Sequence, residues 1–235
     1  MRLLLVLLLV GCTAADDDDS AAPGPDPLAW DVGEDGPFAV GYRSWNRTYQ
    51  PPGVDGPRTI PLNLWYPTEA TEGEPAVYEF GIDARSFLNA PPAAPVHTGG
   101  YPVHVTSHGH RGFGGTSAFL ARRLATHGWV TIAPDHTGNT LATNVEPRPT
   151  SIWYLRGLDV IQAIDALEQL DDGILAGEPD TSAVLLSGHS FGTQTVWSVG
   201  GAPYDLDVIA ERCASGAIAE TACSPGERAA FEAGV

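Results

Sequence analysis

The sequence predicts an α/β fold in which a mostly parallel sheet is flanked by helices and preceded by an antiparallel pair of strands. Three observations support this prediction. Short apolar segments alternate with longer amphipathic segments between residues 103 and 186, as expected for β-α-β units. Two strand-like segments precede that alternation. A serine-centred turn then lies between an apolar segment and a helix-like one.

The first 12 residues have the features of an export signal. Arg2 is followed by an apolar run at 3–10, too short to span a bilayer, and then by Gly11 and Cys12. Residues 9–12 resemble the bacterial lipoprotein signal, in which cleavage leaves the cysteine as a lipid-bearing N-terminus. That resemblance implies lipidation of Cys12 and an exported cell-envelope lipoprotein, facing the periplasm or anchored in the outer membrane. The alternative is an ordinary secretory signal.

Residues 13–30 predict an acidic, proline-rich tether, and the predicted domain covers 31–235. The four aspartates at 16–19 repel one another, and the prolines that follow keep the chain extended. The domain begins with strands at 38–49 and 59–66, joined by a turn rich in proline and glycine. A long connection is expected up to Gly100.

The rest of the domain alternates strands and helices. The expected order is a strand at 103–107, a helix at 116–126, a strand at 129–133, a helix at 151–170 and a strand at 182–186. The long helix carries an apolar stripe that we expect to face the sheet. The stripe consists of Ile152, Leu155, Leu158, Ile161, Ile164, Leu167 and Leu170.

The strongest chemical signal is the segment 187–193, which contains the motif G-x-S-x-G around Ser190. Between a strand and a helix this motif forms a nucleophile elbow, which presents the serine hydroxyl at a sharp turn. The glycines let the strand and the helix approach closely because they have no Cβ. We therefore expect Ser190 to be a nucleophile, with the N–H of Phe191 facing a developing oxyanion.

A second motif, rich in glycine and histidine, occupies residues 107–115. In this architecture the loop at that place supplies the second oxyanion donor, so we expect the N–H of His110 to complete the oxyanion hole. The alternatives are a flexible loop or a metal site made by His104, His108 and His110. No nearby carboxylate or cysteine completes a tetrahedral set, and the sequence therefore implies no metal and no cofactor.

Six motifs, in this order, resemble the branch of the α/β-hydrolase superfamily that contains the platelet-activating-factor acetylhydrolases and dienelactone-hydrolase-like esterases. They occupy residues 36–41, 64–67, 107–109, 124–129, 134–136 and 188–192. The resemblance implies a serine carboxylic-ester hydrolase, similar to an esterase, lipase or acetylhydrolase, that degrades small ester or lipid-like substrates. It also implies Ser190 as the nucleophile and the N–H groups of His110 and Phe191 as the oxyanion hole.

The catalytic partners of the serine depart from that resemblance. The triad of this fold runs Ser, Asp or Glu, then His along the chain, whereas all 7 histidines precede Ser190. Asp205 and Asp207 follow too early to match the family's acid, and we expect both in a surface loop. His136 is the least unsuitable substitute base. We therefore expect a C-terminally truncated chain, the N-terminal two-thirds of a hydrolase, inactive alone and lacking roughly three strand–helix units.

Composition restricts the partners. The net charge is −17 and all 12 basic residues are arginine, which argues against binding to nucleic acid or electrostatic docking on anionic lipid. A membrane would be reached through the lipid anchor. Cys213 and Cys223 can form a disulfide in an exported protein or remain as thiols. The alternative function is a catalytically inactive lipoprotein of this fold that acts as a binding module. Nothing in the sequence specifies an oligomeric state.

Overall fold

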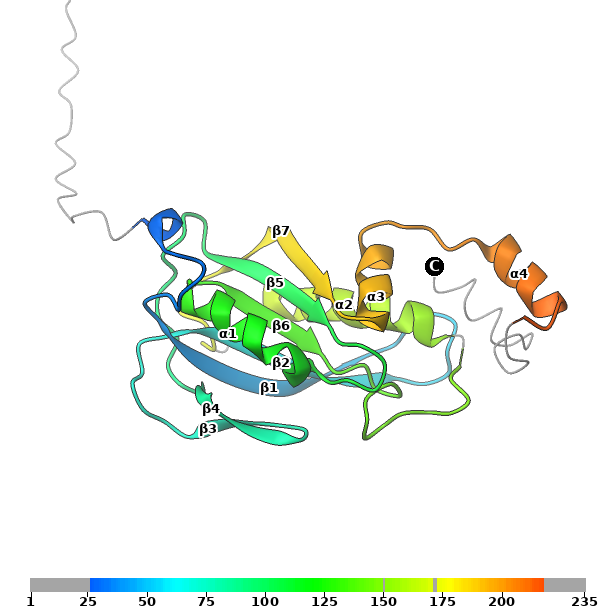
Figure 1. Cartoon of the computed structure of the whole chain (residues 1–235), viewed down its shortest axis with the longest axis horizontal. Helices are drawn as coiled ribbons and strands as arrows, with labels where there is room; N and C mark the ends of the chain where they lie inside the picture. The colour runs from blue at the N-terminus through cyan, green and yellow to red at the C-terminus, as the bar shows by residue number, and fades with distance from the viewer. Residues whose placement is uncertain (1–25, 150, 171–172, 218–235) are drawn as a thin grey trace, which may run out of the picture.

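The protein is built on a seven-stranded mixed sheet with the strand order β3-β4-β1-β2-β6-β5-β7 (Figure 1). A computed structural model describes residues 26–149, 151–170 and 173–217. Its strands are β1 (Ala39–Tyr49), β2 (Arg58–Thr68), β3 (Pro75–Tyr78), β4 (Gly81–Leu88), β5 (Tyr101–Ser107), β6 (Val130–Pro134) and β7 (Pro179–Gly188). Its helices are α1 (Ala118–Thr126), α2 (Ile152–Glu168), α3 (Phe191–Val199) and α4 (Leu206–Ala214), with 3-10 turns η1 (Pro27–Ala29) and η2 (Gly114–Ser117). The predicted α/β fold is confirmed.

Strands β6, β5 and β7 are parallel to one another, and β1 and β4 form a separate parallel pair. Helix α1 connects β5 to β6, and α2 connects β6 to β7 on the far side of β5. Because the strands are parallel, their carboxyl ends meet at one edge of the sheet, where Ser107 of β5 pairs with Gly188 of β7. The other part of the sheet contains the predicted antiparallel pair, β1 and β2. The sheet is therefore mixed rather than mostly parallel.

The predicted long connection before Gly100 contains a hairpin, β3 and β4, which the sequence did not indicate. The usual burial pattern is inverted there, since Asp83 and Ser86 are buried whereas Ile82 is 73% exposed. The Asp83 carboxylate accepts hydrogen bonds from the hydroxyls of Tyr78 and Ser86 and pairs with Arg122. Buried polar groups need such partners, and two of these, Tyr78 and Arg122, come from other elements.

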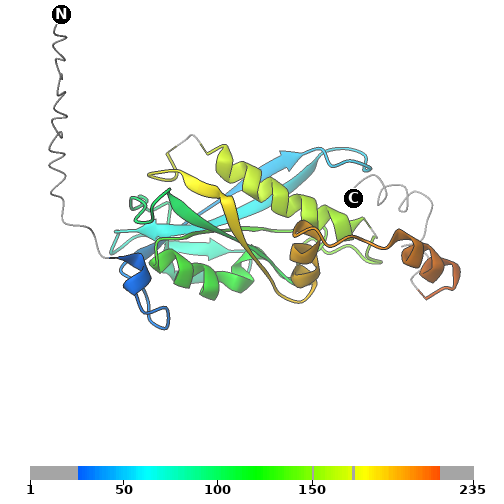
Figure 2. The same cartoon turned by 90° about the horizontal axis from the view of Figure 1, so that it is seen from above.

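Helices cover both faces of the sheet, and Figure 2 shows α1 and α2 on opposite sides. On one face the alanines of α1 pack against β1, β2 and β6. On the other face α2 packs against the apolar side chains of β2, β5 and β6, together with Val199 near the end of α3. The C-terminal end of α3 is therefore held by this core, and its N-terminal end is held by the turn that follows β7.

The apolar stripe predicted for α2 is only partly the buried face. Ile161 is 43% exposed, whereas Arg156 and Asp159 are fully buried with 0% exposure. The sheet-facing apolar residues of α2 are Val160, Ala163, Ala166 and Leu167. The prediction holds for Leu167, Ile164 and Leu170, which pack in the sheet core, and was wrong for Ile161. It missed Arg156 and Asp159 because these charged side chains find buried partners, which a hydrophobicity pattern does not reveal.

The chain after Gly200 forms α4, and the surface loop expected for two aspartates was wrong. Asp205 is the N-cap of α4, with its carboxylate accepting the N–H of Val208 at 2.9 Å, and Asp207 lies in the first helical turn. Both positions suit acidic residues, because the N-terminus of a helix favours negative charge. None of the helices in the described residues is long and apolar enough to cross a bilayer.

Candidate active site

Ser190 stands at the corner between β7 and α3, with φ of 52° and ψ of −117°. A residue with a Cβ rarely adopts a positive φ, and a surrounding structure must hold it there. The constraint comes from two glycines. A Cβ at Gly188 would lie 2.2 Å from the carbonyl oxygen of Gly192, and a Cβ at Gly192 would lie 1.9 Å from that of Ser107. The predicted strand–turn–helix geometry is present, and Ser190 is exposed at its apex.

The glycine-rich loop after β5 lies directly against this corner. A Cβ at Gly109 would be 3.2 Å from the Cβ of Ser190. The loop turns back after Gly109, whose carbonyl accepts the N–H of Gly112 at 2.9 Å, and Arg111 adopts a φ of 58°. Within the described residues, the N–H groups of His110 and Phe191 donate to no other protein atom. Both N–H groups therefore remain able to bind an oxyanion.

A pocket of about 540 Å³ opens beside Ser190 and the loop. Its walls come from the end of β5, the loop, the start of α1 and the elbow. The lining residues are Thr106, Gly109, His110, Arg111, Gly112, Thr116, Ser117, Phe119, Leu120, Ser187, Gly188, His189 and Ser190. Ser190 and His110, one of the two expected oxyanion residues, thus line a space large enough for a small ester, whereas Phe191 follows Ser190 and does not line it.

His136, the substitute base considered from the sequence, lies behind the loop. It is fully buried, with Nδ1 2.8 Å from the Asp159 carboxylate and Nε2 2.9 Å from the Ser107 hydroxyl. Burial lowers the pKa of His136 to about 3, so its ring is neutral. Nδ1–H therefore donates to Asp159 and Nε2 accepts from Ser107. This Ser-His-Asp series has no exposed atom for a substrate.

Asp159 is the charged centre behind the loop. Its carboxylate accepts two hydrogen bonds of 2.7 Å from Arg58, one of 2.7 Å from the Tyr49 hydroxyl, and the bond from His136. Burial raises its pKa, but the hydrogen bonds and the charge of Arg58 together hold it well below its usual value. The carboxylate is therefore ionised and paired, which is how a buried charge is tolerated.

The histidines proposed as alternative metal ligands are occupied by different partners. His104 lies between the hydroxyls of Thr131 and Ser187, and burial lowers its pKa to about 4. His108 Nε2 accepts the backbone N–H of His136, so its Nδ1–H donates to the Gly109 carbonyl. Among the described residues, no group of three His, Cys, Asp or Glu side chains is arranged to hold a metal ion.

His110 belongs to the pocket wall, and both nitrogens of its ring have partners. Nδ1 accepts from the Asn139 amide at 2.7 Å, and Nε2 lies 3.6 Å from the Glu146 carboxylate. This arrangement fixes the ring beside the loop. In the part of the chain described, no histidine ring is hydrogen-bonded to Ser190.

Arg156, Asp159 and Asn139 are the residues of this region that the sequence reasoning missed. All three are fully buried, and they connect α2 with the ends of β5 and β6. A signal was present, because Arg156 and Asp159 lie one turn apart in a helix that is otherwise mostly apolar. Charges at such positions are buried only when they are paired or hydrogen-bonded.

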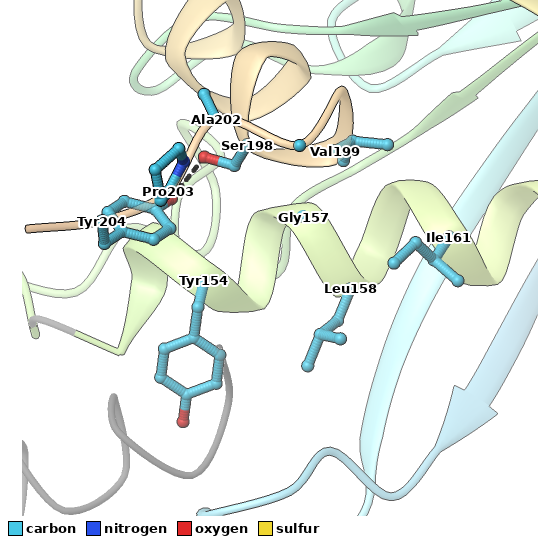
Figure 3. Close-up of a pocket in the computed structure, with 10 residues that line it drawn as sticks. Tyr154, Gly157, Leu158, Ile161, Ser198, Val199, Ala202, Pro203 and Tyr204 are labelled. Atoms are coloured by element: carbon cyan, nitrogen blue, oxygen red, sulfur yellow. Dashed lines mark hydrogen bonds between the residues drawn. The ribbon is translucent and has the colours of Figure 1, made fainter.

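A second hollow, of about 380 Å³, lies between α2 and α3 (Figure 3). Its walls are mainly apolar and include Leu158 and Ile161 of α2. The Ser198 hydroxyl donates to the Tyr204 hydroxyl at 2.6 Å, and this bond joins α3 to the following loop. Ser190 does not line this hollow, which is therefore separate from the pocket at the elbow.

Two of the cysteine predictions fall on positions that the structure does not describe. Cys12, the expected lipidation site, and Cys223 both lie outside the described residues. Cys213 lies on α4 and is disulfide-bonded. The pairing of Cys213 with Cys223 remains a prediction.

Comparison with known proteins agrees with the architecture. No family model and no curated protein sequence matches the chain. A solved structure of a ferulic acid esterase from Streptomyces cinnamoneus superimposes on it with a TM-score of 0.55 at 20% sequence identity. The superposition covers 77% of this chain and 57% of the esterase, so the chain spans little more than half of that protein. The chain therefore has a fold similar to that of this esterase.

Proposed function

We propose that this chain carries the nucleophile and the oxyanion hole of a serine carboxylic-ester hydrolase. The observation that supports this most directly is the strained, exposed Ser190 beside two backbone N–H groups with no protein acceptor. Attack by Ser190 Oγ on an ester carbonyl would place negative charge on the carbonyl oxygen. The N–H groups of His110 and Phe191 would stabilise that charge, and one such donor typically contributes about 3 kcal/mol to lowering the barrier.

No general base for Ser190 is identified among the described residues. No histidine follows Ser190 in the sequence, and the rings of His104, His108, His110 and His136 are hydrogen-bonded to other groups. A serine without a base is a weak nucleophile. We therefore expect residues 1–235 alone to hydrolyse esters very slowly. When a general base and its acid are present, we expect covalent labelling of Ser190 and ester hydrolysis.

The substrate class follows from the pocket and the neighbouring fold. The pocket has an apolar side at Phe119 and Leu120, and its volume of about 540 Å³ suits a small acyl group. The structural neighbour is a ferulic acid esterase, so an aromatic acyl group is one substrate to test. Methyl ferulate and nitrophenyl acetate together distinguish an aromatic from a short aliphatic preference.

A fluorophosphonate probe tests the nucleophile, because it reacts with an activated serine. The natural protein that contains this chain should be labelled at Ser190 and should hydrolyse nitrophenyl acetate, and Ser190→Ala should abolish both. Ser182→Ala is the matched control, since Ser182 is an exposed serine on the same strand, β7. A folded natural protein that is neither labelled nor active would overturn the proposal and favour the binding module.

We also propose that Cys12 anchors the protein in the bacterial cell envelope through attached lipid. Metabolic labelling with radioactive palmitate should mark the wild-type protein and not Cys12→Ser. Release of an unlabelled wild-type protein into the soluble periplasm would contradict the anchor without affecting the proposed chemistry.

A further inference from the structure

A buried arginine lies behind the candidate oxyanion hole. Arg156 of α2 has 0% exposure, and its guanidinium makes four hydrogen bonds to neutral acceptors. Among the described residues, no carboxylate is hydrogen-bonded to it. A buried cation without a directly bonded acid is costly unless hydrogen bonds satisfy its donors, and burial lowers the pKa of Arg156 to about 9. The burial of Arg156 is therefore explained by the segments that its hydrogen bonds hold together.

The four acceptors come from three segments around the candidate site, namely the end of β5 with the first loop residue, α3, and the segment after β6. At the end of β5, one terminal nitrogen donates to the Ser107 hydroxyl at 3.1 Å and to the His108 carbonyl. Nε donates to Thr195 of α3 at 3.0 Å. The guanidinium also lies 4.5 Å from the centre of the Phe191 ring. Arg156 therefore bonds the strand that precedes the loop to the helix that follows the nucleophile.

Asn139 extends this connection into the loop itself. Arg156 donates to its side-chain oxygen at 2.6 Å, so the amide nitrogen faces the other way. That nitrogen donates to His110 Nδ1 at 2.7 Å, and the backbone carbonyl of Asn139 accepts the N–H of Arg111 at 3.0 Å. Asn139 thus holds His110 and Arg111, the two residues that directly follow the Gly109–His110 peptide bond, whose N–H must face the oxyanion.

The Ser107 hydroxyl has a defined orientation for the same reason. Its proton is donated to the neutral His136 ring, which is itself held by Asp159. The oxygen of Ser107 is therefore available to accept from Arg156. The protons of Ser107 and His136 and four of the five N–H hydrogens of Arg156 thus have assigned acceptors, which makes the arrangement rigid.

We propose that Arg156 and Asn139 are positioning residues that hold the loop and the nucleophile helix in the register required for oxyanion stabilisation. This inference rests on the proposed ester hydrolysis and adds the residues that orient the N–H of His110. Neither side chain touches the substrate. Their effect reaches the reaction through the backbone that they hold.

The planar fork of arginine is essential to this role. Its donors point in three directions from one plane, whereas the three donors of lysine radiate from a single nitrogen on a flexible stem. Arg156→Lys retains the positive charge but removes the simultaneous hydrogen bonds to Thr195, to Asn139 and to the end of β5. Asn139→Asp retains the acceptor for Arg156 and removes the donor to His110.

The test is made in the natural protein that contains this chain and compares Arg156→Lys and Asn139→Asp with wild type, with Arg47→Lys as the matched control. Arg47 also bonds to α2, through Gln162 and Gln169, but it lies on β1. For nitrophenyl acetate we expect kcat to fall about 100-fold in Arg156→Lys and about 10-fold in Asn139→Asp with KM little changed, since small misplacements have such effects. Arg47→Lys should match wild type.

Hydrogen–deuterium exchange of the peptide covering residues 108–113 supplies a readout that needs no activity. We expect faster exchange there in Arg156→Lys, with the β1 and β2 peptides unchanged. An unchanged kcat or unchanged exchange at 108–113 in a folded Arg156→Lys would overturn the proposal. Should Arg156→Lys fail to fold, the kcat of Asn139→Asp decides in the same way. A wild-type protein without esterase activity would overturn the proposed function, while the exchange result would still decide the positioning.

Discussion

Replacing Ser190 by glycine should stabilise the protein relative to replacing it by alanine. Both substitutions remove the hydroxyl, so their difference isolates the backbone. A residue with a Cβ held at a φ of 52° stores about 1–3 kcal/mol of strain. Glycine relieves this strain but loses about 0.5–1 kcal/mol through its greater freedom in the unfolded chain. The expected net gain is about 1 kcal/mol, or about 3 °C in Tm for a chain of this size.

Urea and thermal unfolding, followed by circular dichroism, measure this difference. The control is Ala183→Gly, at an exposed position of β7 with ordinary strand geometry. There glycine should destabilise the fold by about 0.5–1 kcal/mol, so the effect of glycine reverses in sign between positions 183 and 190. A Ser190→Gly variant that is no more stable than Ser190→Ala would refute the claim that the elbow stores strain.

Three further substitutions test other parts of the region. Gly192→Ala would place a methyl group 1.9 Å from the carbonyl at the end of β5, and it should lower the free energy of unfolding by more than about 3 kcal/mol; a wild-type urea midpoint would contradict the contact. His104 is buried and neutral with its pKa lowered to about 4, so its contribution is complete above pH 6.5 and lost as the pH falls towards 4. His104→Gln should therefore remove about 3 kcal/mol of the acid destabilisation measured by urea unfolding, and an unchanged pH dependence would exclude this source. Asp159→Asn leaves the largely buried Arg58 unpaired and should cost about 3–5 kcal/mol, whereas Asp165→Asn, on the same helix, should leave the midpoint nearly unchanged.

The elements with a local signal were predictable from the sequence. The strand before Ser190 is apolar, the turn is marked by two glycines, and both features are properties of neighbouring residues. The loop after β5 has the same character, because its glycines are close together in the sequence. For these segments the local pattern and the tertiary structure agree, as expected for a sequence that specifies one fold.

The hairpin of β3 and β4 and the buried network could not be predicted in this way. Asp83 is buried because Arg122, from a helix 39 residues later, reaches it. Arg156 is buried because its acceptors come from β5, α3 and the segment after β6. A charged residue is normally assigned to the surface, and only the assembled neighbours reverse that assignment. The interior polar groups are thus the part of the fold that tertiary placement determines.

The contact between Gly192 and the carbonyl oxygen of Ser107 also bears on how such a site can diversify. The spacing between nucleophile and loop is set there by main-chain atoms alone. The side chains that line the outer pocket, such as Phe119 and Leu120, contribute nothing to that spacing. Variation at these positions can therefore reshape the pocket while the reacting groups keep their separation. Under the proposed function, different atoms would determine selectivity and chemistry, and a new acyl preference could be engineered without rebuilding the elbow.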